Sequence, residues 1–213
     1  MAMVTDDVKP GRRQMYAELT RTAVLQAART LFISHGFEAT SIDDIARLAQ
    51  TSKGAVYHHF RDKREIFTEV YRASQNAIVA RIIDLMTSES MQQHPWERVE
   101  AGTRLFLRSY VDDVDARALL RQVMGVLGWD GVRALDEETA LPFLRATLQE
   151  FVAKGHARVV PIDATVEIFF SVFCNAILYI AAAADPDTAS QEVETVIFTA
   201  LEGLKTPSNR RIT

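Results

Sequence analysis

Residues 40–64 read TSIDDIARLAQTSKGAVYHHFRDKR and predict two short helices joined by a tight turn, with a third helix starting directly afterwards. The first helix has a hydroxyl residue, Thr40 or Ser41, in the position of an N-cap. Asp43 and Asp44 follow at the distance from which a carboxylate can accept a hydrogen bond from a free backbone N–H at the helix start. We therefore expect a capped helix that ends in a turn at residues 48–51.

Two further helix starts follow in the same stretch. Thr51 or Ser52 can cap the second helix, which we expect to end near Phe60. Asp62 and Glu65 repeat the cap-and-carboxylate spacing at the start of the third helix. Three helix starts within 25 residues are typical of a helix-turn-helix, a unit that presents one helix outward.

The second predicted helix leaves small, basic and hydrogen-bonding residues for its outer face. Val56 and Phe60, four residues apart, can anchor the helix to a core. The residues left over are Lys53, Gly54, Ala55, Tyr57, His58 and Lys63. The small residues allow close approach to a groove, the tyrosine and histidine can donate to phosphates, and the first lysine or Ser52 can reach base edges. A solvated helix without a partner would not need this selection, so we interpret it as DNA-binding.

The segment from about residue 20 to residue 67 resembles the DNA-binding domain of the tetracycline-repressor (TetR) family of bacterial transcriptional regulators. The matching residues are AARTLF at 27–32, GFEATSI at 36–42, IA at 45–46, SKGAVYHHF at 52–60 and Lys63. The resemblance covers under a quarter of the chain, but it agrees in residue type and spacing across three helices. It implies that residues 52–55 face the major groove and that Thr40, Tyr57, His58 and Lys63 hold phosphates. The predicted DNA contacts are Thr40, Ser41, Thr51, Ser52, Lys53, Gly54, Ala55, Tyr57, His58 and Lys63.

Composition and charge fit a globular protein with a DNA-binding head. The 213 residues are 48% hydrophobic and 24% charged, enough to bury a sizeable core in one or two domains. Residues 1–65 carry ten Lys and Arg against eight Asp and Glu, whereas the remainder carries fourteen against twenty. A basic head on an acidic body suits a site-specific DNA binder. Cys174 is the single cysteine and the start of the chain lacks an apolar run, so we expect a cytoplasmic protein.

We predict an all-α protein with an N-terminal three-helix DNA-binding domain and a C-terminal helical domain for ligand binding and dimerisation. The expected divisions are a flexible arm at 1–17, the helix-turn-helix domain at 18–65, the larger domain at 66–205 and a tail at 206–213. Arg12 and Arg13 in the arm can touch the DNA backbone or belong to an incidental tail. The other expected helices span 18–35, 63–86, 95–111, 116–124 and 137–154, with a glycine-rich turn at 125–131.

Residues 164–184 are long and apolar enough to resemble a membrane span. Glu167 lies within the segment, Asp163 and Asp185 flank it, and no Lys or Arg cluster lies near either end, so we expect no membrane. A helix that is apolar all round must bury two sides. Together with a second helix at 188–204, it can form a four-helix interface in a two-fold symmetric homodimer, an arrangement the resemblance also implies.

The C-terminal domain is also the expected place for a small, largely apolar effector. The candidate ligand-binding residues are Phe106, Tyr110, Met124, Trp129, Phe143, Phe151, Phe170, Phe173, Cys174, Asn175 and Tyr179. The last three share a helix face with Ser171, where polar groups can line a pocket or bond instead to helix carbonyls or across the dimer.

No residue pattern indicates catalysis, a metal or a cofactor. The acidic cluster Asp112, Asp113 and Asp115 has no histidine partner, and His58 and His59 diverge on a helix. We predict a regulator, a repressor that binds a palindromic operator as a dimer and is released by its effector. The alternatives are an activator of the same family, a helical protein-interaction module without operator specificity, and an enzyme with a helical body.

Overall fold

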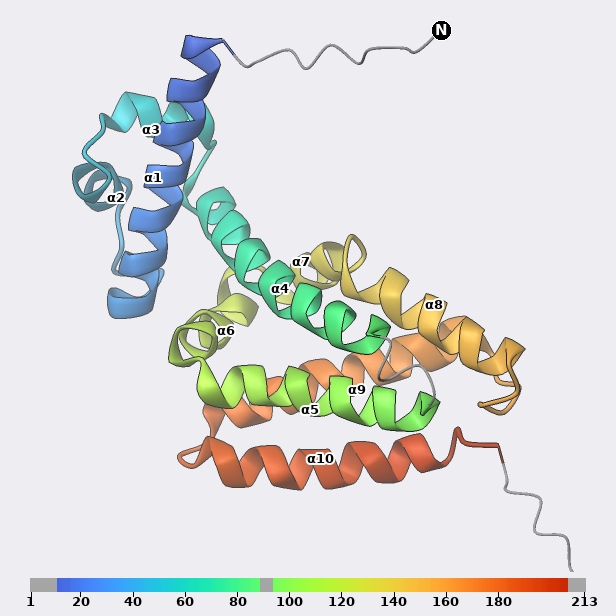
Figure 1. The fold of residues 1–213 in the computed structure, drawn as a ribbon. Helices are drawn as coiled ribbons and strands as arrows, with labels where there is room; N and C mark the ends of the chain where they lie inside the picture. The colour runs from blue at the N-terminus through green and yellow to red at the C-terminus, as the bar shows by residue number, and fades with distance from the viewer. Residues whose placement is uncertain (1–10, 89–93, 207–213) are drawn as a thin grey trace, which may run out of the picture. The chain divides into compact units, whose positions relative to one another are not determined.

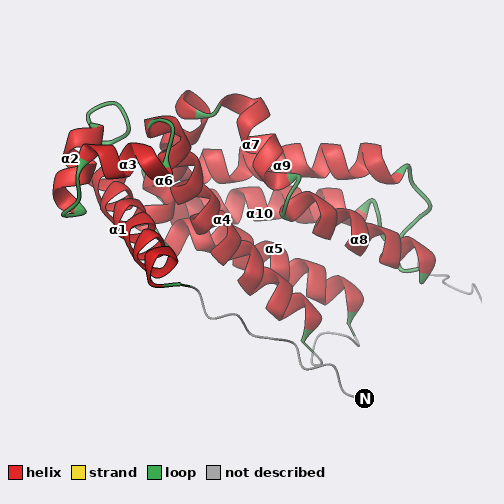
Figure 2. Ribbon diagram, turned by 90° about the horizontal axis from the view of Figure 1, so that it is seen from above, coloured by secondary structure: helices red, strands yellow, loops and turns green. Residues whose placement is uncertain are grey.

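The computed structural model describes residues 11–88 and 94–206, and the regular secondary structure of this part of the chain is entirely helical (Figure 1 and Figure 2). Its ten helices are α1 (Arg12–His35), α2 (Ile42–Leu48), α3 (Lys53–His59), α4 (Lys63–Thr87), α5 (Pro95–Asp112), α6 (Val114–Val126), α7 (Gly128–Asp136), α8 (Ala140–Ala153), α9 (Ile162–Ala182) and α10 (Pro186–Glu202). The all-α prediction is confirmed.

The chain forms two compact units, Met1–Val70 and Tyr71–Thr213. Helix α4 runs without a break through the residues at which they meet, and so it contributes to both units. The sequence prediction placed the division five residues earlier, after residue 65, inside the same helix.

The first unit packs α1, α2, α3 and the start of α4 around an aromatic core. The rings of Phe32 on α1, Phe37 in the following loop and Phe67 on α4 lie with their centroids 5.3 to 5.7 Å apart. Fully buried aliphatic side chains complete the core: Val24, Ala28, Ile45, Val56 and Ile66. Helices α2 and α3 have seven residues each, too few for stability alone, so this packing is what keeps them folded.

The predicted N-caps of the two short helices are confirmed. Ser41 Oγ accepts a hydrogen bond from Asp44 N at 3.1 Å, and Asp44 Oδ2 accepts one from Ser41 N at 3.2 Å, which is a capping box. Ser41 Oγ also donates to Asp44 Oδ2 at 2.5 Å, and this bond, together with that from Ser41 N, holds the pKa of the Asp44 carboxyl below its usual value. Ser52 Oγ accepts from Ala55 N at 3.1 Å and caps α3.

The turns on either side of α3 are equally local. Gln50 has φ 52°, the left-handed conformation that lets the chain reverse between α2 and α3. At the start of α4, Asp62 Oδ1 accepts from Glu65 N at 2.8 Å, as predicted. The Glu65 carboxylate accepts in return from Arg61 N at 2.7 Å, one residue before the expected position.

The second unit is built around α9, which packs against α5, α6, α8 and α10. Its fully buried side chains include Leu107, Tyr110, Leu119, Leu141, Ile180 and Ile197. Gly102 on α5 permits a close approach to α4, because a Cβ there would lie 2.8 Å from Met86 Sδ.

Two predicted loops are helical. Helix α1 begins at Arg12 rather than at residue 18, so residues 12–17 of the predicted arm are helical, while residues 1–10 lie outside the described part. The glycine-rich turn predicted at 125–131 is wrong, because α6 continues to Val126 and α7 starts at Gly128. Gly128, with φ 69°, marks the joint, and burial of Val132 and Leu135 stabilises the following turn as a helix.

The remaining helices agree with the prediction to within a few residues. Helices α5, α9 and α10 differ by one or two residues at their ends from the predicted ranges 95–111, 164–184 and 188–204. The helix predicted at 137–154 starts at Ala140. Most of the segment between the helices predicted at 63–86 and 95–111, and most of the predicted tail at 206–213, lies outside the described residues.

Helix α9 is the one helix of the described chain that has the length and apolar composition of a membrane span. Only 39% of its most apolar window is buried in the unit, so one of its faces remains outward. Composition alone does not make it a membrane helix, since a core helix can have the same composition.

Candidate nucleic-acid interface and ligand cavity

Helix α3 is anchored by one face and open on the other. Val56 and, just after the helix, Phe60 are buried in the first unit, as predicted. On the outer side, Tyr57 is 50% exposed, and Lys53 and His58 are also exposed. The helix therefore presents hydrogen-bonding and basic groups to solvent from a rigid, capped scaffold.

Gly54 leaves the first turn of α3 without a side chain at a position where a side chain would fit. A Cβ at this position would meet nothing closer than Ser52 Oγ, at 3.9 Å. Its backbone is helical, and glycine in a helix costs roughly 0.5–1 kcal/mol relative to alanine. Neither packing nor backbone geometry within the described protein requires a glycine at this position.

Lys53 is held by a neighbour that the sequence analysis did not connect to it. Its ammonium lies 2.9 Å from Asp43 Oδ2 on α2, and this hydrogen bond raises the pKa of Lys53. Both side chains are more than half exposed, so the pair is weak and can open when a stronger anion approaches.

The side chains of two predicted phosphate contacts form hydrogen bonds inside the first unit. Thr40 is 3% exposed, and its hydroxyl donates to Gly36 O at 2.8 Å. The ammonium of Lys63 donates to Phe37 O at 2.6 Å and to Thr40 O at 2.9 Å, and lies 4.2 Å from the centre of the Phe37 ring. These contacts tie the start of α4 to the loop before α2, and the phosphate role of both residues stays a prediction.

The other predicted DNA contacts lie around the start of α2 and α3. The hydroxyls of Ser41 and Ser52 cap these helices and remain on the exposed surface. Thr51 and Ala55 are half-buried, and the backbone N–H of Thr51 donates to Ala46 O at 2.9 Å in the turn. Together with the exposed side chains of α3, they form one candidate surface.

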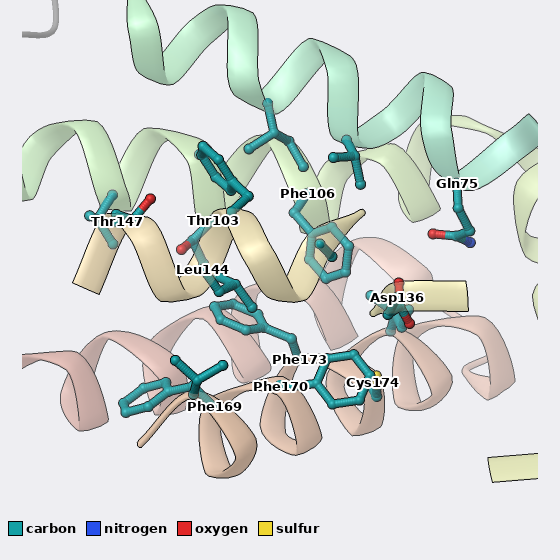
Figure 3. A pocket seen from close by; sticks show the side chains of 18 of the residues that line it. Gln75, Thr103, Phe106, Asp136, Leu144, Thr147, Phe169, Phe170, Phe173 and Cys174 are labelled. Atoms are coloured by element: carbon teal, nitrogen blue, oxygen red, sulfur yellow. The ribbon is translucent and has the colours of Figure 1, made fainter. Parts of the chain in front are cut away.

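The second unit encloses a cavity of about 190 Å³, lined by residues from each of its helices, α4 to α10 (Figure 3). A water molecule needs about 10–15 Å³ of such space, so the cavity has room for a much larger molecule. Eight of the eleven predicted ligand residues line it: Phe106, Met124, Trp129, Phe143, Phe151, Phe170, Phe173 and Cys174. Aromatic pairs in the wall include Phe106 with Phe173 and Trp129 with Phe170, both at 5.8 Å between ring centroids.

Three predicted ligand residues lie elsewhere. Tyr110 is fully buried beside the cavity, where its hydroxyl donates to Gln75 Oε1 at 2.8 Å. Asn175 and Tyr179 lie on the outward side of α9, along a shallow apolar groove between α9 and α10. The helix turns by about 100° per residue, so Cys174 faces the cavity and its neighbour Asn175 does not.

The polar residues of this outward face bond locally. Ser171 Oγ donates to Glu167 O at 2.9 Å, and Asn175 Nδ2 donates to Ser171 O at 2.8 Å. The hydroxyl of Tyr179 donates to Glu192 on α10 at 2.9 Å. Bonding to helix carbonyls, one of the two expectations for Ser171 and Asn175, is therefore what the structure has.

The cavity contains polar residues that the sequence analysis missed. Gln75 on α4 and Asp136 on α7 line it, as do Thr103 and Thr147 (Figure 3). Burial raises the pKa of Asp136 to about 6 and that of the Cys174 thiol to about 12. A polar residue on the apolar side of a helix, as Gln75 is between Tyr71 and Val79, was the signal that could have found the first of them.

Comparison with known proteins assigns both units. The family model for bacterial regulatory proteins of the tetR family matches residues 24–70, and the tetracyclin repressor-like C-terminal domain matches residues 96–204. Among the described residues, no group of three histidine, cysteine or acidic side chains is placed to hold a metal ion.

Individual relatives match over shorter stretches. The TetC protein of transposon Tn10 from Escherichia coli is 27% identical over 135 residues, which are 63% of this chain and 64% of that protein. The regulator AcrR of Shigella flexneri is 39% identical over 62 residues, 29% of each chain. The chain thus spans less than two thirds of the length of these relatives.

Solved structures share the fold. The crystal structure of a TetR-family transcriptional regulator from Pectobacterium atrosepticum has a TM-score of 0.77 at 22% identity, and the match covers 94% of this chain and all of that one. The two matching domains together span most of this chain, and the second alone covers half of it. This protein belongs to the TetR family of bacterial regulatory proteins.

Proposed function

We propose that this protein represses transcription by binding a palindromic operator as a homodimer, and that a small molecule in the cavity of the second unit releases it. The single observation that carries the proposal is the bare, capped face of α3 around Gly54, which nothing inside the protein requires. Membership in a family of regulatory proteins agrees with this reading and with the expectation that the chain is not an enzyme.

DNA contact is assigned to the surface formed by residues 51–58 and Ser41. The exposed first turn of α3 would enter the major groove, with Lys53 and Ser52 near base edges and Tyr57 and His58 near phosphates. Gly54 would let the duplex come close to the backbone. Thr40 and Lys63 would support this surface from inside the first unit.

Dimerisation is assigned to the outward faces of α9 and α10. Ile168 is 63% exposed, Val196 66% and Tyr179 53%, and they lie around one groove. Adjoining apolar side chains of this kind favour a protein interface. Two copies related by a two-fold axis would form a four-helix interface and present two α3 helices to half-sites about 34–36 Å apart.

Helix α4 is the proposed route from effector to operator. Its residues Tyr71, Gln75, Val79, Ile82 and Met86 line the cavity at helical spacing. The same helix starts at Lys63, whose ammonium is bonded to the loop before α2. A ligand that binds one position of α4 better than another would change DNA affinity, by about 1–3 kcal/mol for a typical allosteric coupling.

The proposed divisions are DNA binding within residues 18–65 and effector binding with dimerisation within 66–205. We propose a cytoplasmic location, where the operator is found, and burial of the outer face of α9 in the dimer rather than in a membrane.

The test is binding of the purified protein to the DNA upstream of its own gene, titrated against random DNA at two salt concentrations. We expect a footprint on an inverted repeat and a sequence preference of about a thousandfold or more. Equal affinity for both DNAs would contradict operator recognition. Transcript levels in a deletion strain then separate repression, which predicts an increase, from activation, which predicts a decrease.

A further inference from the structure

Among the described residues, the cavity wall has one acidic side chain and no basic one. Asp136 is the one carboxylate among the described lining residues, and no Lys, Arg or His lines the cavity. No hydrogen bond or ion pair of the described residues involves the Asp136 side chain, and burial alone accounts for its perturbed acidity. An anionic ligand would find no cation here and would be repelled by Asp136.

A second unsatisfied polar group lies at the same end. Gln75 is 8% exposed; its Oε1 accepts from the Tyr110 hydroxyl, but its Nε2 is buried without a hydrogen-bond partner. Gln75 and Asp136 both line the cavity, and the Tyr110 hydroxyl bonded to Gln75 is fully buried beside it. Figure 3 shows Gln75 entering from α4 and Asp136 from α7, away from Thr147.

The Gln75 amide needs a hydrogen-bond acceptor and the Asp136 carboxylate needs a donor. A buried donor without an acceptor and a buried carboxylate without a donor are both unfavourable. A ligand hydroxyl can accept from Gln75 Nε2 and donate to Asp136, so one group satisfies both. An ammonium group can only donate and leaves Gln75 unpaired, and a carboxylate can only accept.

We propose that the effector is an uncharged, largely apolar molecule whose hydroxyl group binds between Gln75 and Asp136. This inference rests on the proposed function, namely that the cavity is the effector site. The apolar body would lie against the aromatic wall formed by residues such as Phe106, Trp129 and Phe173.

Three probes of one shape and different polar groups test the proposal: 1-adamantanol, 1-adamantylammonium and 1-adamantanecarboxylate. The chain's two tryptophans, Trp96 and Trp129, both line the cavity, so their fluorescence reports binding of these non-absorbing probes. We expect the alcohol to bind at least about tenfold more tightly than the carboxylate and about threefold more tightly than the ammonium. Tightest binding by either ion would overturn the proposal.

Variants locate the effect. Asp136→Asn supplies a donor to the carboxylate, so the preference for alcohol over carboxylate should fall below about threefold. Gln75→Leu combined with Tyr110→Phe removes the donor without leaving the tyrosine unpaired, and should weaken alcohol binding about two- to tenfold. Thr147→Val, a change of similar size elsewhere in the cavity, is the control and should alter neither. Equal effects of all three changes would contradict the assignment.

Failure of the wider proposal has a different signature. If none of the three probes changes tryptophan fluorescence or the melting temperature at millimolar concentration, the cavity is not a ligand site. In that case the effector role of the cavity fails, and this inference fails with it.

Discussion

The two units treat their polar groups in opposite ways. In the first unit, hydroxyls and carboxylates such as Ser41, Asp44 and Ser52 bond within three residues along the chain, and even the Lys63 ammonium finds carbonyl partners. In the second unit, Gln75 Nε2 is buried without a partner, and the half-buried Asp136 carboxylate faces an apolar cavity with no hydrogen bond from the described residues. Among the described residues of the first unit no buried side-chain nitrogen or oxygen lacks a hydrogen-bond partner, which suits a rigid frame for an exposed surface, whereas unpaired groups in the second unit leave room for a ligand to add stability.

The largest expected effect tests whether the outer face of α9 forms the dimer interface. Ile168→Glu places a charge twice in a two-fold interface without altering the core of one chain, since the side chain is 63% exposed. We expect dimer affinity to fall by about 3 kcal/mol or more, measured by light scattering across a concentration series.

The matched control is Val159→Glu, since Val159 is 91% exposed on the loop between α8 and α9. That variant should stay dimeric. Dimers of unchanged affinity in the Ile168 variant would remove the outer face of α9 from the interface.

The next largest effect is expected for Lys63, the lysine of the first unit that bonds to backbone carbonyls. Lys63→Met leaves the carbonyls of Phe37 and Thr40 without their charged donor, and we expect a loss on the order of 2–3 kcal/mol in the free energy of unfolding. Urea denaturation measures it, with Lys53→Met as the exposed control. A stable Lys63 variant that binds DNA with a reduced salt dependence would restore the phosphate role predicted from the sequence.

Asp136→Asn should raise the free energy of unfolding near neutral pH, in contrast to the loss expected for Lys63→Met. The pKa of Asp136 is raised from 3.8 to about 6 in the folded protein, so as pH rises from 4 to 6 the unfolded chain loses its proton first and stability falls. Above pH 6 the wild type carries this cost and the amide does not, so the variant should be more stable by on the order of 2 kcal/mol.

Below pH 4 the difference should vanish. The groups that interact electrostatically with Asp136 are Tyr71, Tyr110 and Cys174, whose pKa values are all raised, and so they stay neutral over this range. Urea unfolding at pH 4 and pH 7.5 makes the comparison. If the stability difference between the wild type and Asp136→Asn is the same at pH 4 and at pH 7.5, Asp136 does not titrate in this window.

Gly54→Ala separates folding from function within the first unit. The new Cβ meets no atom of the protein within 3.9 Å, so helix preference should stabilise α3 by roughly 0.5–1 kcal/mol. If a groove approaches this turn, operator affinity should nevertheless fall, by about tenfold. Tighter or equal operator binding by the more stable variant would contradict the assignment.

The smallest effect concerns the Lys53–Asp43 pair. Asp43→Asn frees Lys53 from a partner that competes with DNA, so operator affinity should rise about two- to threefold. Lys53→Ala should instead reduce the preference for operator over random DNA. An equal loss on both DNAs would place Lys53 on the backbone of the duplex.

The difference between local and distant hydrogen-bond partners explains which features could be predicted from the sequence. Caps at Ser41 and Ser52 and the anchors Val56 and Phe60 depend on neighbours within four residues, so spacing was enough to predict them. The family of the head and its helical class followed from that local pattern. The internal bonds of Lys63 were not predicted because its carbonyl partners lie more than twenty residues away along the chain.

The cavity was harder to predict because it depends on which side of each helix faces inward. Large aromatic residues such as Phe106 and Phe173 do line the cavity, since few other places in a helical domain accept them. Ser171, Asn175 and Tyr179 were grouped with Cys174 by their spacing, yet the packing of α10 places them outside. Gln75 and Asp136 belong to helices whose meeting point is set only by tertiary packing.

Helix α9 carries neighbouring residues that belong to different surfaces. Ile168 and Asn175 line the groove, whereas the adjacent residues Phe169 and Cys174 line the cavity. One inserted or deleted residue within it would rotate everything downstream by about 100° and so move side chains out of register with both surfaces. Natural variants of this chain should therefore differ in length at the joints between helices and keep the length of α9 fixed. Changes in ligand preference and in pairing between subunits would also tend to be inherited together, because neighbouring codons encode both.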